Sequence, residues 1–206
     1  MSVIHESVLP VIIGPGFHDQ GLTDRFVRSL PSFVQPHIVE AFPADPIAVW
    51  RWLTRTFAAP TAANVANKER SADESAADNT ATGLIAIGFS AGVVGLAGAL
   101  TLWQQQDNQV ARFFAIDGWG VPIMGLPVCR LSHDYFTHWS SLALGAGSVN
   151  FYADPPVDHL QMWGDAQQVN GRWVSDSNEE LMTAADFLQQ QLKLEWNKLC
   201  KDRYCC

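Results

Sequence analysis

The sequence predicts an α/β protein, a three-layer α/β/α sandwich with a mostly parallel sheet of about six strands. Short apolar segments rich in β-branched residues alternate with helical patterns, which is typical of parallel strands buried on both faces. A chain of 206 residues, 48% of them hydrophobic, is long enough for one substantial core, so we expect a single domain over residues 1–206. The predicted strands are Leu9–Ile13, His37–Phe42, Leu84–Gly88, Arg112–Ile116, Pro127–Leu131 and Ser148–Tyr152.

Two helices are indicated by the residues at their start. Asp45 followed by Pro46 is a favourable helix N-terminus, and apolar residues then recur on one face as far as Phe57. Near the carboxyl end, Ser177–Glu180 has the form of a capping box, and apolar residues continue at helical spacing over 181–199. We expect a helix to begin at each position, and the second one to cover one face of the sheet.

The segment 58–82 differs in composition from the rest of the chain. It consists largely of Ala, Asn, Ser, Asp and Glu, with almost no large apolar residue after Val65. Such a segment cannot bury enough apolar surface to form core. We therefore predict a mobile insertion on the surface of the domain.

Charge and hydropathy exclude several classes of protein. The net charge of −8, without a cluster of Lys or Arg, argues against a nucleic-acid partner, which needs a basic surface. The apolar run Leu84–Leu102 approaches the length of a membrane span, but five glycines over 83–98 favour a buried strand followed by a helix, so no membrane span is expected. The first residues lack the features of a secretory signal, which predicts a cytoplasmic location.

The motif Gly88-Phe89-Ser90-Ala91-Gly92 carries the main functional signal. It follows the predicted strand Leu84–Gly88 and precedes a small-residue helix, which is the context that a nucleophile elbow requires. The flanking glycines allow a tight turn that exposes the Ser90 hydroxyl above the sheet. The helix N-terminus, with the Ala91 amide, favours a developing oxyanion. The same motif also occurs as an ordinary strand-to-helix turn.

In this motif and its setting, the chain resembles the α/β-hydrolase superfamily from about Leu9 to Trp163. The resemblance implies a minimal fold without a lid, in which the loop after the first strand supplies a second oxyanion donor, here the Phe17 amide. The segment Gly14-Pro15-Gly16 also resembles the start of a dinucleotide-binding loop. Asp19 stands where that loop needs its third glycine, so the oxyanion role is favoured.

A serine nucleophile needs a histidine base and a carboxylate that orients the base. The resemblance implies the chain order serine, acid, histidine, which selects His159 after the last predicted strand. For the acid, both Asp134 and Asp117 follow predicted strands. We favour Asp134, because it follows the strand just before that of His159, and keep Asp117 as the alternative.

These residues predict a serine hydrolase that cleaves a carboxylic ester or related acyl bond of a small-molecule substrate, without a cofactor. The neighbouring pairs His18-Asp19, His133-Asp134 and Asp158-His159 raise the possibility of a metal site. Adjacent residues on a strand point in different directions, so we expect no metal. The alternative from another class is a non-catalytic protein of the same fold that binds a small molecule or a protein.

Overall fold

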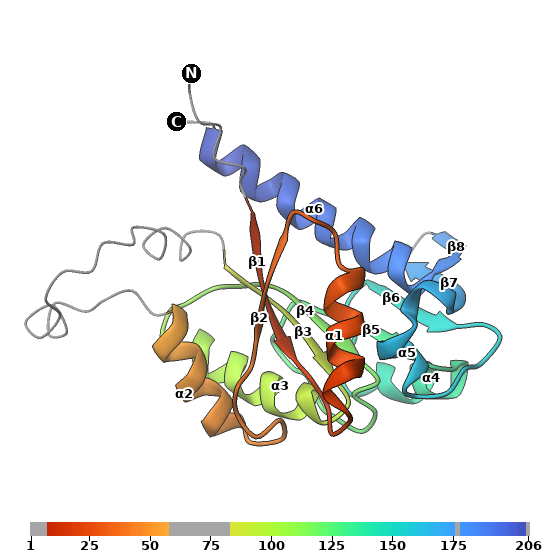
Figure 1. Ribbon diagram of the computed structural model, residues 1–206, viewed down its shortest axis with the longest axis horizontal. Helices are drawn as coiled ribbons and strands as arrows, with labels where there is room; N and C mark the ends of the chain where they lie inside the picture. The colour runs from red at the N-terminus through yellow and green to blue at the C-terminus, as the bar shows by residue number, and fades with distance from the viewer. Residues whose placement is uncertain (1–7, 58–82, 176–177, 205–206) are drawn as a thin grey trace, which may run out of the picture.

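The computed structural model describes residues 8–57, 83–175 and 178–204, so the insertion predicted at 58–82 lies outside the described residues. Eight strands form one sheet in the order β2-β1-β3-β4-β5-β6-β7-β8 (Figure 1). The strands are β1 (Leu9–Gly14), β2 (Val34–Ile38), β3 (Leu84–Phe89), β4 (Val110–Ile116), β5 (Val128–Ser132), β6 (Val149–Ala153), β7 (Asn170–Ser175) and β8 (Asn178–Thr183).

Helices follow most of the strands along the chain. The α-helices are α1 (Gln20–Ser29), α2 (Pro46–Phe57), α3 (Ala91–Gln104), α4 (Tyr135–Leu142), α5 (Gln161–Gly164) and α6 (Ala184–Tyr204), and a 3-10 helix, η3, covers Ala166–Gln168. The predicted start of α2 is confirmed, because Asp45 Oδ1 accepts hydrogen bonds from the backbone N–H groups of Ile47 at 2.9 Å and Ala48 at 3.1 Å. Among the described helices, none combines the length and the apolar composition that crossing a membrane requires.

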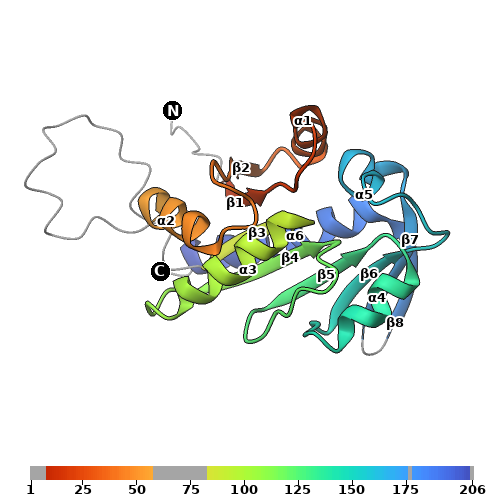
Figure 2. The same ribbon diagram turned by 90° about the horizontal axis from the view of Figure 1, so that it is seen from below.

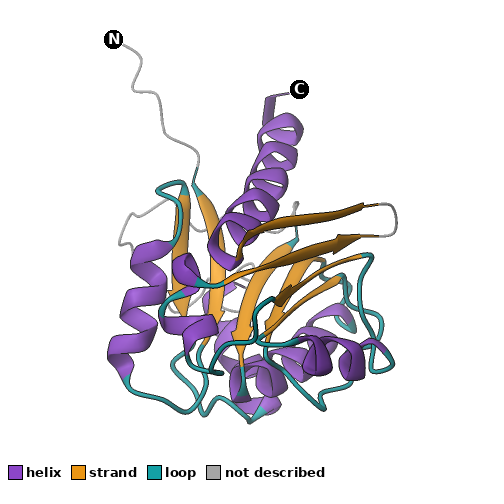
Figure 3. Cartoon of the chain, turned by 90° about the vertical axis from the view of Figure 1, so that its right-hand side faces the viewer, coloured by secondary structure: helices purple, strands orange, loops and turns teal. Residues whose placement is uncertain are grey.

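Strands β1 to β6 run parallel to one another, and β7 and β8 are antiparallel additions next to β6. The predicted mostly parallel α/β sheet is therefore confirmed, but the expected number of about six strands is too low. Figure 3 shows the β7–β8 hairpin at one edge of the sheet. Because the parallel strands all point the same way, the loops after β1, β3, β4, β5 and β6 meet at one edge of the sheet.

The sequence located most of the parallel strands to within two residues, with β2 as the exception. It covers Val34–Ile38, whereas the prediction was His37–Phe42. Pro36 lies inside this strand, and the prediction began only after it. Proline is tolerated here because β2 is at the edge of the sheet and has a neighbour on one side only.

The predicted helix start at Ser177–Glu180 is wrong, because the structure has strand β8 from Asn178 to Thr183 and begins α6 at Ala184. A pairing with β7, from Ser175 opposite Asn178 to Asn170 opposite Thr183, takes these residues into the sheet. The cap is Thr183, whose hydroxyl accepts from the Asp186 backbone N–H at 3.0 Å. Tertiary pairing thus overrides a local capping signal.

Two apolar cores lie on opposite faces of the sheet. One includes Phe26 of α1 and Phe187 of α6, and the other includes Leu53 of α2 and Leu96 of α3. Figure 2 shows α3 in front of the sheet and α6 behind it. The sheet is thus buried on both faces, which leaves the loops at its carboxyl edge as the place for a site.

Candidate active site

Ser90 lies between β3 and α3 in a backbone conformation that non-glycine residues rarely adopt. Its φ is 52° and its ψ is −117°. Its backbone N–H donates to the Ile116 carbonyl of the neighbouring strand at 2.9 Å, which fixes the turn against the sheet. A strained residue held by its surroundings at the end of a strand is the geometry of a nucleophile elbow.

Two glycines permit the close packing around this turn. A Cβ at Gly92 would collide with the carbonyl oxygen of Gly14, so α3 begins directly against the loop that follows β1. A Cβ at Gly16 would lie 3.0 Å from the Cβ of Ser90. The structure therefore brings the loop that continues into Phe17 beside the serine. The Phe17 ring itself is exposed and packs at 5.1 Å, between ring centroids, from Phe42.

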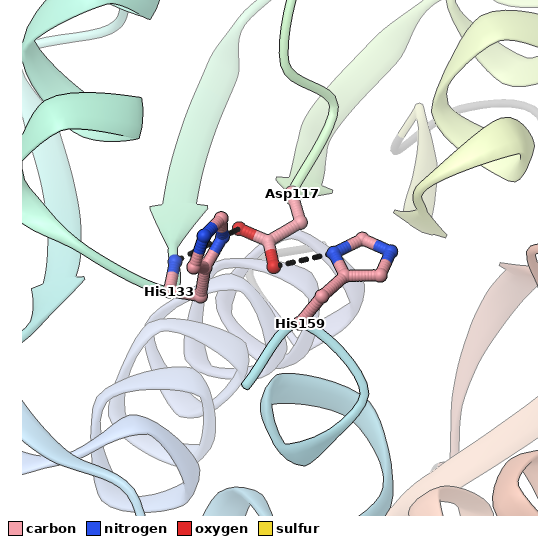
Figure 4. Close-up of side chains that lie close together, drawn as sticks. All are labelled: Asp117, His133 and His159. Carbon is pink, nitrogen blue, oxygen red and sulfur yellow. Dashed lines mark hydrogen bonds and ion pairs between the residues drawn. The ribbon is translucent and has the colours of Figure 1, made fainter. Parts of the chain in front are cut away.

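His159 comes from the loop between β6 and α5 and meets Asp117, which follows β4. The Nδ1 atom of His159 lies 2.9 Å from Oδ2 of Asp117 (Figure 4). The side chain of Asp117 is 1% exposed and that of His159 is 41% exposed. The His159 ring stacks on Phe89 at 4.6 Å between centroids. Phe89 therefore covers one face of the imidazole, and Asp117 holds its Nδ1 edge. Nε2, at the opposite edge of the ring, is left to accept a proton.

Asp117 owes its position to an unusual backbone. Its φ is +49°, in the left-handed region, and its N–H donates to the Leu131 carbonyl at 2.8 Å. Burial of a carboxylate is unfavourable unless its oxygens are hydrogen-bonded. Both oxygens are: Oδ2 contacts His159, and Oδ1 accepts from the backbone N–H of His133 at 2.8 Å.

The favoured acid, Asp134, does not take the position expected for it, and the structure places the alternative, Asp117, on His159. Asp134 is the N-cap of α4, where Oδ1 accepts from the Thr137 backbone N–H at 2.6 Å. Burial raises the pKa of Asp134, but hydrogen bonds from Thr137 and the charge of His133 outweigh it and hold this pKa below its ordinary value. Its carboxylate therefore stabilises a helix start.

His133, for which no role in a triad was predicted, lies on the far side of Asp117 from His159. Its Nδ1 is 3.1 Å from Asp117 Oδ1, and the oblique direction of the N–H makes this contact an ion pair rather than an aligned hydrogen bond. The contact with Asp117 raises the pKa of His133, burial opposes the rise, and the charges of Asp134 and Asp158 add to it. The signal in the sequence was its place directly after a parallel strand next to that of Asp117.

Asp117, His133 and His159 each offer one possible metal ligand, and these atoms lie within 4.8 Å of one another. The pairs His18-Asp19, His133-Asp134 and Asp158-His159 contribute only His133 and His159 to this group. Both Nδ1 atoms face oxygens of Asp117 at 2.9 and 3.1 Å. That arrangement suits N–H donors on a carboxylate, whereas a metal would need the nitrogen lone pairs.

These side chains open into one cavity with a volume of about 460 Å³. Ser90, His159 and Asp117 line it together with His133 and Thr137. The structure thus brings the predicted nucleophile, the predicted base and the alternative acid to one cavity, with the Ala91 amide at the start of α3 beside them. A site of this kind can carry a nucleophilic attack assisted by a base.

No protein-family model matches this chain, and no curated protein matches it.

Proposed function

We propose that this chain is a serine hydrolase with a minimal α/β-hydrolase fold that cleaves carboxylic esters or related acyl bonds. The observation that carries the proposal is the 2.9 Å hydrogen bond between His159 and buried Asp117 in the cavity that also contains Ser90 at its strained turn. A histidine held by a carboxylate beside a strained serine is the arrangement that activates a hydroxyl for attack.

In the proposed reaction, the Ser90 oxygen attacks the substrate carbonyl and its proton passes to Nε2 of His159. Asp117 stabilises the imidazolium, which then returns the proton to the leaving alcohol as the carbonyl–oxygen bond breaks. The product is an acyl ester of Ser90. A water molecule attacks that ester, gives its proton to His159 and releases the acid, and the proton returns to the Ser90 oxygen.

The tetrahedral intermediate of each step carries a negative oxygen, and we assign its stabilisation to the backbone N–H groups of Ala91 and Phe17. Ala91 lines the cavity at the N-terminus of α3, where orphan N–H groups and the helix dipole favour negative charge. The support for Phe17 is the contact of the preceding residue, Gly16, with Ser90. Two donors of this kind typically contribute several kcal/mol, about 3 or more for each.

The walls of the cavity favour an uncharged acyl group. Its apolar lining comes from Ala91, Val94, Trp119 and Val121, and no Lys or Arg is among the described residues that line it. The described lining therefore offers no guanidinium or ammonium partner for the phosphates of a large anionic leaving group, and the chain has a net charge of −8. We therefore propose a small neutral ester as the substrate class.

A fluorophosphonate probe tests the proposal, because it reacts only with an activated serine. We expect labelling of the wild type, loss of labelling in Ser90→Ala, and unchanged labelling in Ser29→Ala, whose hydroxyl donates to the Phe26 carbonyl at the end of α1. Labelling and ester hydrolysis should both resist a chelator, which a metal-dependent site would not. A folded wild type that fails to react would favour the alternative, a non-catalytic binding protein with this fold.

A further inference from the structure

The backbone of His133 connects the two loops that carry Asp117 and His159. Its N–H donates to Oδ1 of Asp117 at 2.8 Å. Its carbonyl oxygen accepts from the N–H of Val157, in the loop that leads to His159, at 3.0 Å. His133 therefore lies at the junction between the acid and the base, although it contributes no atom to the proton path described above.

The side chain of His133 is directed at carboxylates with both ring nitrogens. Nδ1 lies 3.1 Å from Oδ1 of Asp117, and Nε2 lies 3.6 Å from Oδ2 of Asp134. Neither contact is an aligned hydrogen bond, so both are contacts between a ring nitrogen and a carboxylate charge. Two carboxylates this close to one ring favour its protonated form, because an opposite charge within about 4–6 Å stabilises the charged state. Figure 4 shows the Asp117 carboxylate between the two histidine rings, with one oxygen directed at each.

We propose that His133 is a positioning residue of this site, whose imidazolium holds Oδ1 of Asp117 so that Oδ2 stays directed at His159. This inference rests on the proposed function and adds a fourth side chain to it. A carboxylate that is held at one oxygen by both the backbone and the side chain of His133 cannot rotate freely about its Cβ–Cγ bond. His159 then loses little orientational freedom as it accepts the proton from Ser90.

The charges around His133 are consistent with this role. Asp117 faces it from the end of β4, Asp134 from the start of α4, and Asp158 and His159 come from the loop before α5. Three of these four groups are carboxylates, and their negative charges favour a cation at His133. The contact with Asp117 raises the pKa of His133. The cation in turn provides a charged partner for the carboxylate of Asp117, whose side chain is 1% exposed.

Two substitutions separate positioning from mere packing. His133→Leu keeps much of the bulk without a donor, whereas His133→Asn places an amide N–H₂ near the position of Nδ1. On a p-nitrophenyl ester we expect His133→Leu to lower kcat roughly tenfold or more, as for loss of a close contact between opposite charges, with KM nearly unchanged. His133→Asn should recover a large part of kcat. His138→Leu, which removes a buried histidine from α4, is the matched control for folding.

A proton NMR measurement keeps this inference separate from the proposed function. The Nδ1 proton of His159 should give a downfield resonance in the wild type, an exchange-broadened one in His133→Leu, and a resonance close to the wild type in His133→Asn. Equal kcat and equal resonances in the wild type and a folded His133→Leu would overturn the positioning role. If His133→Leu does not fold, the protonated fraction of His133 is measured in the wild type by NMR titration. A fraction below one half at pH 6.5 would contradict the proposal. A resonance that responds to His133 in a protein without hydrolytic activity would refute only the serine hydrolase.

Discussion

At the scale of single residues, the site depends on which of two aspartates reaches His159. Asp117 and Asp134 both follow parallel strands, so their strand positions alone do not distinguish them. The structure separates them by backbone conformation, because Asp117 turns at φ +49° and directs its carboxylate at His159, while Asp134 is extended and caps α4. That difference arises from contacts with Leu131 and Thr137, which sequence spacing does not reveal.

The first prediction compares the Asp-to-Asn variants of these two residues. Asp117→Asn should lower kcat by about three to four orders of magnitude, because an amide no longer holds the His159 tautomer or stabilises its imidazolium. Asp134→Asn should change kcat far less and leave the melting temperature nearly unchanged, since Asn caps a helix about as well as Asp. Steady-state kinetics on both variants checks this. A larger loss in Asp134→Asn would restore the acid predicted from the sequence.

The second prediction concerns pH and stability. Because the folded state raises the pKa of His133, its contribution to the free energy of unfolding is complete below the unfolded pKa of about 6.5 and is lost as pH rises through the folded value. The free energy of unfolding of the wild type, measured in urea, should therefore fall over this pH window relative to that of His133→Asn. Burial lowers the pKa of His37 and His138, so their protonation destabilises the folded state at lower pH. Both residues are present in the two proteins, so their contributions cancel in the difference. A constant difference between the two proteins would contradict the linkage.

At the scale of elements, the sequence predicted those whose signals are local. Continuous apolar runs identified the buried strands β1, β3 and β4, and an Asp-Pro start identified α2. The β7–β8 hairpin was missed because its residues carry few apolar side chains in alternation, and Leu181 is 70% exposed. Its formation depends on pairing with β6, which is remote in sequence from the end of β8.

Arg130 of β5 shows how one buried side chain organises two loops near the cavity. Its guanidinium donates to the Val121 carbonyl at 2.8 Å and to the Gly145 carbonyl at 2.6 Å, and weaker bonds reach Gly118 and Leu144. Burial lowers its pKa to about 10, which leaves it charged at neutral pH. Trp119 and Val121 of this loop line the cavity, so the bonds from Arg130 to Gly118 and Val121 hold one wall of the cavity in place.

The third prediction follows from these bonds. Arg130→Met should lower the free energy of unfolding by about 3 kcal/mol, because it leaves buried carbonyls without donors. It should also raise KM, since the wall formed by Val121 loses its support. Arg25→Met is the matched control: its ion pair with Asp165 is half exposed, so we expect a change below about 1 kcal/mol. Urea titrations of both variants give the comparison, and equal effects would show that Arg130 is not a structural centre.

At the scale of the whole molecule, the sheet separates two cores that share its strands. Leu53 of α2 and Phe187 of α6 are both fully buried, on opposite faces. The alternation of strands and helices in the sequence predicted this arrangement, because parallel strands require helices on both sides. The carboxyl edge of the sheet was predictable for the same reason, whereas the exact contacts of the loops that meet there were not.

The fourth prediction tests whether the two cores unfold together. Leu53→Ala should destabilise the protein by about 2–5 kcal/mol and Phe187→Ala by about 3–5 kcal/mol. Because the side chains do not touch, the double variant should lose the sum to within about 0.5 kcal/mol. Each variant should melt in one transition by both near-UV and far-UV circular dichroism. Two separated transitions would indicate that the faces of the sheet behave as independent units.

The order of the sheet has a consequence for self-association. An open sheet ends in two strands whose outer backbone groups can template the addition of another chain, which leads to fibrils. Here the outer strands are β2 and β8. Pro36 removes one backbone donor from β2, and Glu180 places a negative charge on β8 beside Glu179, whose carboxylate is paired with Arg172. A second copy that paired with β2 would meet a missing backbone donor, and one that paired with β8 would meet like-charge repulsion. Both edges therefore disfavour aggregation through the sheet.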